Sequence, residues 1–209
     1  MQILSHRGFW LEPAEKNTMA AFERSFALGF GTETDIRDHA GELVIAHDMP
    51  TGGEPTLVDV LDLMRETGCE GTLALNIKAD GLQDALARTM AVYPDIDYFV
   101  FDMSMPQTLA YAAAGTPFCL RASEYEQHLP PIAGSRGIWL DGFQSCWYDA
   151  IRLAGMLDAG EVYLVSAELH RRPYMAHWQQ LRAMGLASRA GLALCTDHPL
   201  AAKEFFDEH

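Results

Sequence analysis

Short runs of apolar and β-branched residues recur along the 209-residue chain, and segments with helical spacing separate most of them. In one such segment Met19, Phe22 and Phe26 fall three or four positions apart, which places them on one face of a helix. Most of the runs are largely apolar, as expected of strands covered on both faces. The pattern predicts eight strands that alternate with helices. The runs span residues 2–6, 31–36, 72–77, 98–103, 117–122, 137–142, 162–167 and 192–197.

Capping residues mark the ends of two of the expected helices. Thr56 precedes an amphipathic stretch, with Asp59 at the third helical position and Gly68 after its last apolar residue. A threonine of this kind caps exposed N–H groups at a helix start, and glycine readily adopts the left-handed conformation that ends a helix. Pro106 and Gly115 bracket a later helix in the same way.

The alternation of strands and helices indicates an α/β protein, a single compact (β/α)8 barrel of the TIM type, small for that class. A doubly wound open sheet is the structural alternative. The chain contains no repeat, low-complexity linker or shift in composition that would mark a second domain. We therefore expect one domain over residues 1–209.

One segment breaks the alternation. GELVIAHD, residues 41–48, has a strand-like pattern but follows GTETDI after only the four residues RDHA. A connection this short permits a hairpin and excludes a helical crossover. We expect a β-hairpin excursion after the second strand that distorts the barrel and brings His47 back toward Glu33 and Asp35.

Polar side chains gather where the predicted strands end. In a barrel, the carboxyl ends of all strands form one rim, where active sites are built. Glu124 and Glu168 lie just beyond their strands on the same side. The residues in or at the end of a strand run are His6, Glu33, Asp35, Asn76, Asp102, Arg121, Asp141 and Asp197.

Glu33 and Asp35 are two residues apart, so on a strand both side chains point the same way. Two converging carboxylates repel each other unless they are protonated, separated by water or bridged by a cation. Oxygen ligands suit Mg²⁺ or Ca²⁺ better than zinc. Taken alone, this pair is more simply explained as solvated or bridged to Arg37, and His6 and His47 taken singly are more simply structural. Their joint occurrence at one rim favours a catalytic site.

The amino-acid composition indicates which ligands and which cellular compartment to expect. The net charge is −14, from 15 basic and 29 acidic residues; such a surface repels phosphate backbones and argues against nucleic-acid binding. The four cysteines are scattered, no apolar stretch reaches membrane-spanning length, and no charged-then-apolar leader begins the chain. We expect a reduced, cytoplasmic protein without stable membrane insertion.

Three segments at the amino end resemble the signature of the glycerophosphodiester phosphodiesterases, within the superfamily that includes the phosphatidylinositol-specific phospholipases C. They are HRG, NTMAAFERSFALGF and ETDIRDHAGELVIAHD, and the dense match covers residues 5–50. Looser similarity continues in LNIK (75–78) and CTDHP (195–199). In the middle of the chain the resemblance rests on the order of strands and helices alone. The segment VSAELH (165–170) is not part of the usual signature, and we interpret it as the mark of a bacterial subgroup.

The resemblance implies a distorted (β/α)8 barrel that hydrolyses a small-molecule phosphodiester with a divalent cation, Mg²⁺ or Ca²⁺. His6 and His47 match the general acid–base histidines, and Arg7 matches the residue that contacts phosphate. One histidine would deprotonate water or a substrate hydroxyl, and the other would protonate the departing alkoxide. Each contributes roughly 10²–10⁴-fold.

The implied metal ligands are Glu33 and Asp35, and Lys78 matches a basic residue that follows the third metal-ligating strand and would neutralise the charge of the substrate phosphate. Asn76 stands where the family carries a third carboxylate. An amide oxygen ligates Mg²⁺ or Ca²⁺ with one negative charge fewer, and Glu124 or Glu168 are the candidate substitutes.

The chain also departs from the family after the hairpin. Between MPTGGEP and the helix near residue 56 it lacks a sizeable insertion of the glycerophosphodiesterases. Because the mouth should be more open, glycerophosphodiester specificity does not follow from the resemblance. Two other functions remain as alternatives. Because Asn76 replaces a carboxylate, the barrel could bind a phosphorylated ligand without turnover. The second alternative is a phospholipase D-like lyase that forms a cyclic phosphate. The chain has no G-x-S-x-G elbow and no P-loop.

Overall fold

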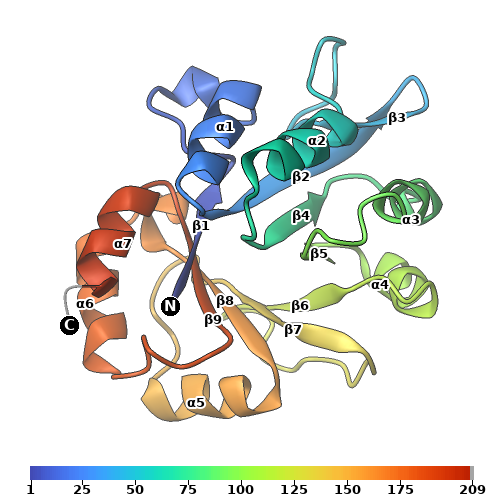
Figure 1. Ribbon diagram of the computed structural model, residues 1–209. Coiled ribbons are helices and arrows are strands. Elements are labelled where there is room, and N and C mark those ends of the chain that lie inside the picture. The colour runs from blue at the N-terminus through green and yellow to red at the C-terminus, as the bar shows by residue number, and fades with distance from the viewer. Residues whose placement is uncertain (208–209) are drawn as a thin grey trace.

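The computed structural model describes residues 1–207, which form a closed barrel of parallel strands surrounded by helices (Figure 1). Strand β1 pairs with both β9 and β2, and these two contacts close the ring. The predicted barrel is confirmed, and the open sheet is excluded because the pairing of β1 with β2 joins the two ends of the series of eight parallel strands. Around the ring the order is β1-β9-β8-β7-β6-β5-β4-β2, with β3 attached to β2.

All eight predicted runs form strands of the barrel, and their ends differ from the predicted ends by a few residues. The strands are β1 (Gln2–His6), β2 (Gly31–His39), β3 (Glu42–Ile45), β4 (Leu73–Ile77), β5 (Tyr98–Phe101), β6 (Phe118–Ala122), β7 (Ser135–Leu140), β8 (Glu161–Val165) and β9 (Leu192–Thr196). The helices are α1 (Met19–Ala27), α2 (Leu57–Thr67), α3 (Gln83–Met90), α4 (Met105–Ala113), α5 (Ala150–Ala159), α6 (Tyr174–Ala183) and α7 (Pro199–Asp207), with short 3₁₀ turns η1 (Pro13–Glu15) and η2 (Ala167–His170).

The hairpin after the second strand is confirmed. β3 runs antiparallel to the end of β2, with Ile36 opposite Ile45. The return carries the chain back over the barrel, where the Ala46 N–H donates to the Asp35 carbonyl at 3.0 Å. Figure 1 shows β3 and the end of β2 reaching past the other strands.

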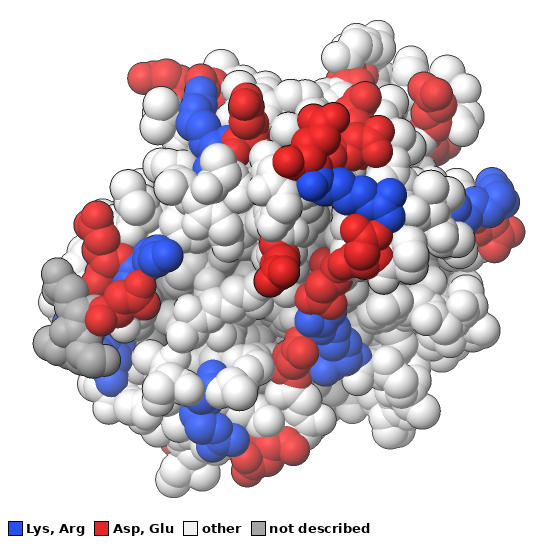
Figure 2. Space-filling view, in the orientation of Figure 1, with Lys and Arg blue, Asp and Glu red and all other residues white. Residues whose placement is uncertain are grey.

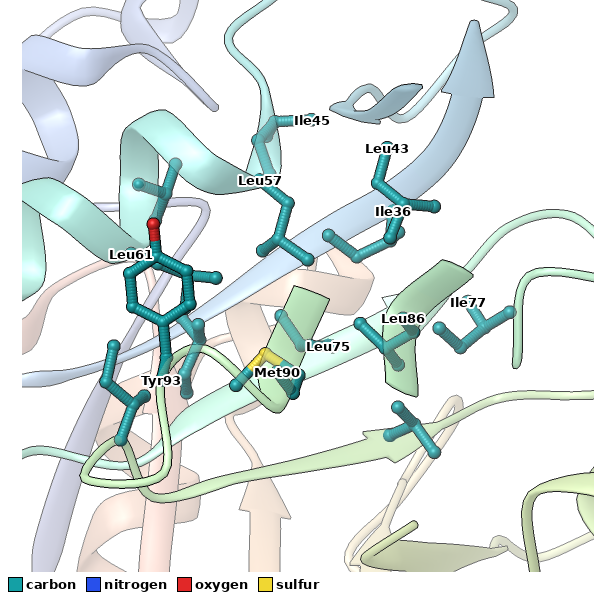
Figure 3. Close-up of a cluster of buried hydrophobic side chains, with 14 of the residues drawn as sticks. Ile36, Leu43, Ile45, Leu57, Leu61, Leu75, Ile77, Leu86, Met90 and Tyr93 are labelled. Atoms are coloured by element: carbon teal, nitrogen blue, oxygen red, sulfur yellow. The ribbon is translucent and has the colours of Figure 1, made fainter. Parts of the chain in front are cut away.

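Helix α2 illustrates how the outer layer is fixed. The Thr56 side chain accepts from the Asp59 N–H, the Asp59 carboxylate accepts from the Thr56 N–H, and Gly68 ends the helix at a φ of 65°. One face of α2 packs on α1 and β3, and Leu61 on this helix is fully buried in the cluster drawn in Figure 3. Truncating such a leucine to alanine costs about 2–5 kcal/mol.

The wall between β5 and β7 is less regular than the rest. β5 and β6 share a single register pair, Val100 with Phe118, and residues 123–134, all of them described, contain no helix. A second apolar layer fills the barrel interior and forms the floor beneath the carboxyl ends of the strands. It includes Leu4, Ala74, Phe99, Phe101, Trp139, Tyr163 and the buried thiols Cys119 and Cys195.

Charged side chains on the face shown in Figure 2 are interleaved, with basic groups scattered among more numerous acidic ones. Among the ion pairs of the described residues, the Arg136 guanidinium is paired with both Asp97 and Glu161. Within residues 1–207, no helix combines the length and the apolar character that crossing a bilayer requires.

Candidate active site

The turn that follows β1 brings the first two polar residues of the site to the barrel mouth. Strand β1 ends at His6, and Arg7 then takes a φ of 60° and Gly8 a φ of 83°. A side chain at Gly8 would have its Cβ 2.8 Å from the Ala21 backbone in α1. Only glycine permits this approach, so His-Arg-Gly is a structural requirement as well as a chemical motif.

A cavity of about 210 Å³ opens at the carboxyl ends of the strands. Its lining confirms that most of the rim residues expected from the strand ends face one space. On the side of strands β1–β4 lie His6, Arg7, Glu33 and Asn76; on the side of β5–β8 lie Asp102, Arg121, Trp139, Asp141, Phe143, Val165, Leu169 and His170. We refer to these two halves as the β1–β4 side and the β5–β8 side of the mouth.

His6 is held by the end of the last strand. Its Nδ1 lies 2.6 Å from Oδ1 of Asp197, and the Lys16 ammonium lies 3.5 Å from Oδ2 of the same carboxylate. Burial alone would raise the pKa of Asp197, but the hydrogen bond and charge of His6 together with Lys16 lower it. The ionised carboxylate therefore orients the imidazole, with Nε2 left to face Glu33 at 3.8 Å.

Glu33 is a buried acid with little local compensation. Its residue is 2% exposed, and no hydrogen-bond donor among the described residues reaches Oε2. Burial, and secondly the negative charge of Asp35, raise the pKa of Glu33 to about 7. The pair of acids is therefore neither solvated nor bridged to Arg37, which donates to the His47 carbonyl instead.

Asp35 is fully buried beneath the mouth and is surrounded by donors. Its Oδ2 lies 3.0 Å from Arg7 Nε and accepts from the Asn17 amide at 2.9 Å, while Oδ1 lies 3.3 Å from the Lys78 ammonium. Two cations thus balance this carboxylate in place of the single bridge that the sequence suggested. Lys78 reaches the site through Asp35 and is not part of the cavity lining.

Asn76 faces the mouth beside the two acids, as expected from its strand position. It is the register partner of Asp35 and lines the cavity with Glu33. Four buried carboxylate or amide oxygens make no hydrogen bond in the described chain: Asn76 Oδ1, Glu33 Oε2 and Asp35 Oδ1 at the mouth, and Gln83 Oε1 in α3. Asp35 Oδ1 has the Lys78 ammonium as an ion-pair partner only. Buried oxygens of this kind call for an explanation.

The three oxygens at the mouth are of the type that a hard divalent cation prefers, and they come from adjacent strands in register. The described residues contain no group of three or more His, Cys, Asp or Glu side chains placed to hold a metal ion. The third oxygen at this site is the amide of Asn76, which is none of these four residue types. Any ion here would be held by two carboxylates and a neutral oxygen.

His47 lines a second hollow beside the mouth. This hollow, of about 470 Å³, is bounded by Arg7, Lys16 and Asn17 on one side and by the turn after β3 on the other. The His47 side chain is 47% exposed, with Nδ1 2.9 Å from Asp48. Its backbone folds back as expected, but its ring does not line the same cavity as His6. Arg7 lines both.

The two carboxylates considered as replacements for a third acidic ligand are bonded to other groups. Glu124 accepts from the backbone N–H groups of residues 143–145. Glu168 accepts from Ser166, Thr196 and the Asp197 N–H. Neither is part of the cavity lining. Glu168 instead supports the backbone that carries the partner of His6.

Several residues of the site were not predicted from the sequence, among them Lys16 and Phe143, and two others make bonds to the predicted acids. Asn17 follows the HRG turn, bonds Asp35, and accepts from Thr34 Oγ1 at 2.9 Å; its place within NTMAAF was the only signal. His170, at the end of VSAELH, lines the mouth and bonds through Nε2 to Oδ1 of Asp141. Asp141 was expected at the rim, but its bond to His170 was not predicted, because two residues 29 positions apart form no recognisable local sequence pattern.

Comparison with solved structures finds proteins whose fold is similar to that of this chain over nearly its whole length. The chain is similar to a glycerophosphodiester phosphodiesterase from Parabacteroides distasonis, with 15% identity, a TM-score of 0.67, and coverage of 99% of this chain and 96% of the other. It is similar to an Oleispira antarctica phosphodiesterase in complex with the product sn-glycerol-3-phosphate, with 15% identity, a TM-score of 0.67, and coverage of 100% and 97%.

A third similar structure is the glycerophosphodiester phosphodiesterase of Agrobacterium tumefaciens, with 18% identity, a TM-score of 0.66, and coverage of 99% of both chains. No family model and no curated protein sequence matches this chain. At such identities the comparison establishes the fold. The barrel that the sequence resemblance implied is thereby confirmed over nearly the whole chain.

Proposed function

We propose that this protein is a phosphoric diester hydrolase of the glycerophosphodiester phosphodiesterase type, acting on a small-molecule substrate. The observation that carries the proposal is the meeting of two hollows at Arg7, one lined by His6 and the other by His47. A phosphate bound at Arg7 would have one histidine on each side, with room for an alcohol in each hollow.

Arg7 is suited to bind the phosphate. Its ion pair to Asp35 uses Nε, which leaves the two terminal nitrogens of the guanidinium for the paired oxygens of a phosphodiester. Lys16 lines the second hollow beside it. In a protein of net charge −14, these groups supply the local positive potential that an anionic substrate requires.

Proton transfer falls to the two histidines. Asp197 holds Nδ1 of His6, so that Nε2 is the atom that exchanges a proton with the substrate or the attacking water. His47 stands across Arg7 with Asp48 at its Nδ1. One histidine would activate the nucleophile and the other would protonate the leaving alkoxide, for roughly 10²–10⁴-fold each.

Glu33, Asp35 and Asn76 would hold a divalent cation, Mg²⁺ or Ca²⁺. When bound, such an ion supplies Lewis acidity and absorbs negative charge as the diester reacts. Two features of this chain support the assignment: the three oxygens at the mouth that make no hydrogen bond within the described residues, and the raised pKa of Glu33, which a nearby cation would reverse. Lys78 would keep Asp35 in place through their ion pair.

The similar structures support the same reaction. They are named as phosphodiesterases, and one was solved with the product sn-glycerol-3-phosphate. All four cysteines are free thiols, as is usual in a reducing compartment, and we place the protein in the cytoplasm.

The test is the hydrolysis of bis(p-nitrophenyl) phosphate with added Mg²⁺ or Ca²⁺ and with excess chelator. We expect turnover with a cation, loss of turnover on chelation, and recovery when the cation is restored. His6→Ala and His47→Ala should each lower turnover by about 10²-fold or more. His39→Ala is the matched control, since His39 is exposed at the hairpin tip; its turnover should equal that of the wild type.

Two outcomes would replace the proposal. Binding of phosphate without turnover under any cation would make the protein a phosphate-binding barrel, the function that Asn76 motivates. Phosphorus NMR of the products of a diester with a neighbouring hydroxyl distinguishes hydrolysis from cyclisation. A cyclic phosphate as the final product would make it a lyase.

A further inference from the structure

Helix α4 differs from the rest of the protein surface in carrying no charge. Residues 103–120, which include the whole of α4, contain no Asp, Glu, Lys, Arg or His side chain, and they form the longest uncharged stretch of the chain. Within residues 1–207, each of the other α-helices carries at least one charged side chain. In a protein of net charge −14, an uncharged helix on the outside of the barrel requires an explanation.

A row of apolar side chains lies on the solvent side of this helix. Met105, Leu109 and Ala113 are four residues apart, so they form one ridge along the helix. Met105 is 48% exposed and Leu109 is 54% exposed, and Ala113 is exposed as well. The buried residues of α4 are Thr108 and Tyr111, which lie outside this row. The chain therefore leaves an apolar ridge in contact with solvent.

The ring of helices around the barrel is interrupted beside α4. The connection from β6 to β7, residues 123–134, contains no helix, whereas each of the other parallel connections contains one. In a barrel of this class the helices form a continuous outer ring, but in Figure 1 no helix stands between α4 and α5. A hollow of about 360 Å³ lies there, between Met105 and Thr108 on α4 and Leu129 and Pro130 on the connection.

The hollow extends the uncharged surface. Residues 129–135, which include Leu129 and Pro130, carry no charged side chain. The Asp, Glu and Arg side chains that line the hollow are paired with one another, since Arg121 contacts both Asp102 and Glu126. We refer to the exposed ridge of α4 together with residues 129–134 as the α4 face.

The charge of the protein indicates what covers this face. Because the net charge is −14, two copies repel each other wherever their acidic surfaces approach, and self-association is favoured only through a face without charge. A basic partner would bind the acidic surfaces and would gain nothing from the α4 face. The centres of protein interfaces are depleted in charged residues and enriched in methionine. A second copy of this chain brings a surface that matches in both respects.

We propose that two copies of this protein associate through the α4 face as a dimer with two-fold symmetry, in which the two α4 helices pack antiparallel. A two-fold axis brings the same surface of both copies together. Leu109 is the middle residue of the ridge, so it lies at the axis and meets its own counterpart. Met105 then lies opposite Ala113 of the other copy, a large side chain against a small one, on both sides of the axis.

The test is the molar mass in solution, measured by size-exclusion chromatography with light scattering over a series of protein concentrations. One chain has a mass of 23.2 kDa, and we expect twice that mass at the highest concentrations. Leu109→Glu should raise the dissociation constant of the dimer by about 100-fold or more, because it places two like charges at the axis. This variant should therefore elute as a monomer.

Ile151→Glu is the matched control. Ile151 lies on α5 and is 84% exposed, so the same change of side chain is made on a helix outside the α4 face. Its molar mass should equal that of the wild type at every concentration. Both substitutions are made at exposed positions, and thermal unfolding of each variant verifies that the fold is intact.

A mixture of two variants tests the symmetry. Leu109→Glu and Leu109→Lys should each be monomeric alone, because each places like charges together at the axis. An equimolar mixture should recover the dimer, since the introduced carboxylate of one copy then faces the introduced ammonium of the other. Failure of the mixture to form a dimer would overturn the placement of Leu109 at the axis.

Two other results would overturn the proposal as a whole. A wild-type mass of 23.2 kDa at every concentration would show that the α4 face does not bind a second copy. A dimer that survives Leu109→Glu but is lost in Ile151→Glu would place the interface on another face. Neither result depends on hydrolysis of a phosphodiester, so the proposed function is tested separately.

Discussion

Replacing Glu33 by glutamine should stabilise the cation-free protein. Burial and the neighbouring Asp35 raise the pKa of Glu33 from 4.5 to about 7, so the folded state holds this proton more tightly than the unfolded state does. Below pH 4.5 both states are protonated and the acid has no cost. As the pH rises from 4.5 to 7 the unfolded chain gains stability by releasing its proton, and above 7 the full cost applies.

That cost sets the size of the effect. A difference between a pKa of 4.5 and one of about 7 corresponds to about 3 kcal/mol. Glu33→Gln removes the charge but keeps the shape, so its free energy of unfolding should exceed that of the wild type by up to about 3 kcal/mol at pH 8 and by nearly nothing at pH 4. For a chain of this length, 3 kcal/mol raises Tm by roughly 6–12 °C.

The assay is urea unfolding followed by tryptophan fluorescence, in chelator, from pH 4 to pH 8. Asp35→Asn is the matched control with the opposite sign, because it leaves Arg7 and Lys78 without their buried partner; we expect it to destabilise the protein at pH 8. Added Mg²⁺ or Ca²⁺ should stabilise the wild type more than Glu33→Gln. A stability difference independent of pH, or a Glu33→Gln protein less stable than the wild type at pH 8, would refute the reasoning.

Three further changes test other parts of the molecule. Asp197→Asn should lower kcat by about 10²-fold or more with little change in KM, because it frees His6 Nδ1 without touching the substrate; an unchanged pH profile of kcat would contradict the pairing. Asn76→Glu should lower the cation concentration that gives half-maximal activity, and an equal requirement in both proteins would show that residue 76 does not contact the ion. Burial lowers the pKa of His177 from 6.5 to about 4, so about 3 kcal/mol of stability present above pH 6.5 should be lost as the pH falls to 4; His177→Gln should flatten that loss in urea unfolding, and a parallel curve would contradict it.

The parts of this structure that the sequence predicted follow from local patterns. Strands covered on both faces are continuous apolar runs, and the helix after Thr56 is marked by its own caps. The hairpin was predictable because four residues cannot hold a helical crossover. The gathering of polar residues at one rim was also predictable, because all parallel strands of a barrel end on the same side.

The contacts that the sequence did not predict depend on loops. Asp35 was predicted as a metal ligand, with solvent or Arg37 as the simpler alternative, and neither interpretation included the contacts of Arg7 and Asn17 with its carboxylate. Glu124 was a candidate ligand, and it instead binds three N–H groups of an irregular segment some twenty residues later. Such partners are set by backbone conformations that leave no periodic signal in the sequence.

The irregular wall between β5 and β6 links ligand binding to local opening of the barrel. One register pair joins the two strands, and the Asp102–Arg121 contact bridges their carboxyl ends directly above that seam. Amide protons of sparsely paired strands exchange with solvent through small openings. A ligand that forms hydrogen bonds with both side chains would hold β5 and β6 together at this point. Amide hydrogen exchange in the two strands should then slow, and this slowing would measure ligand binding without an activity assay.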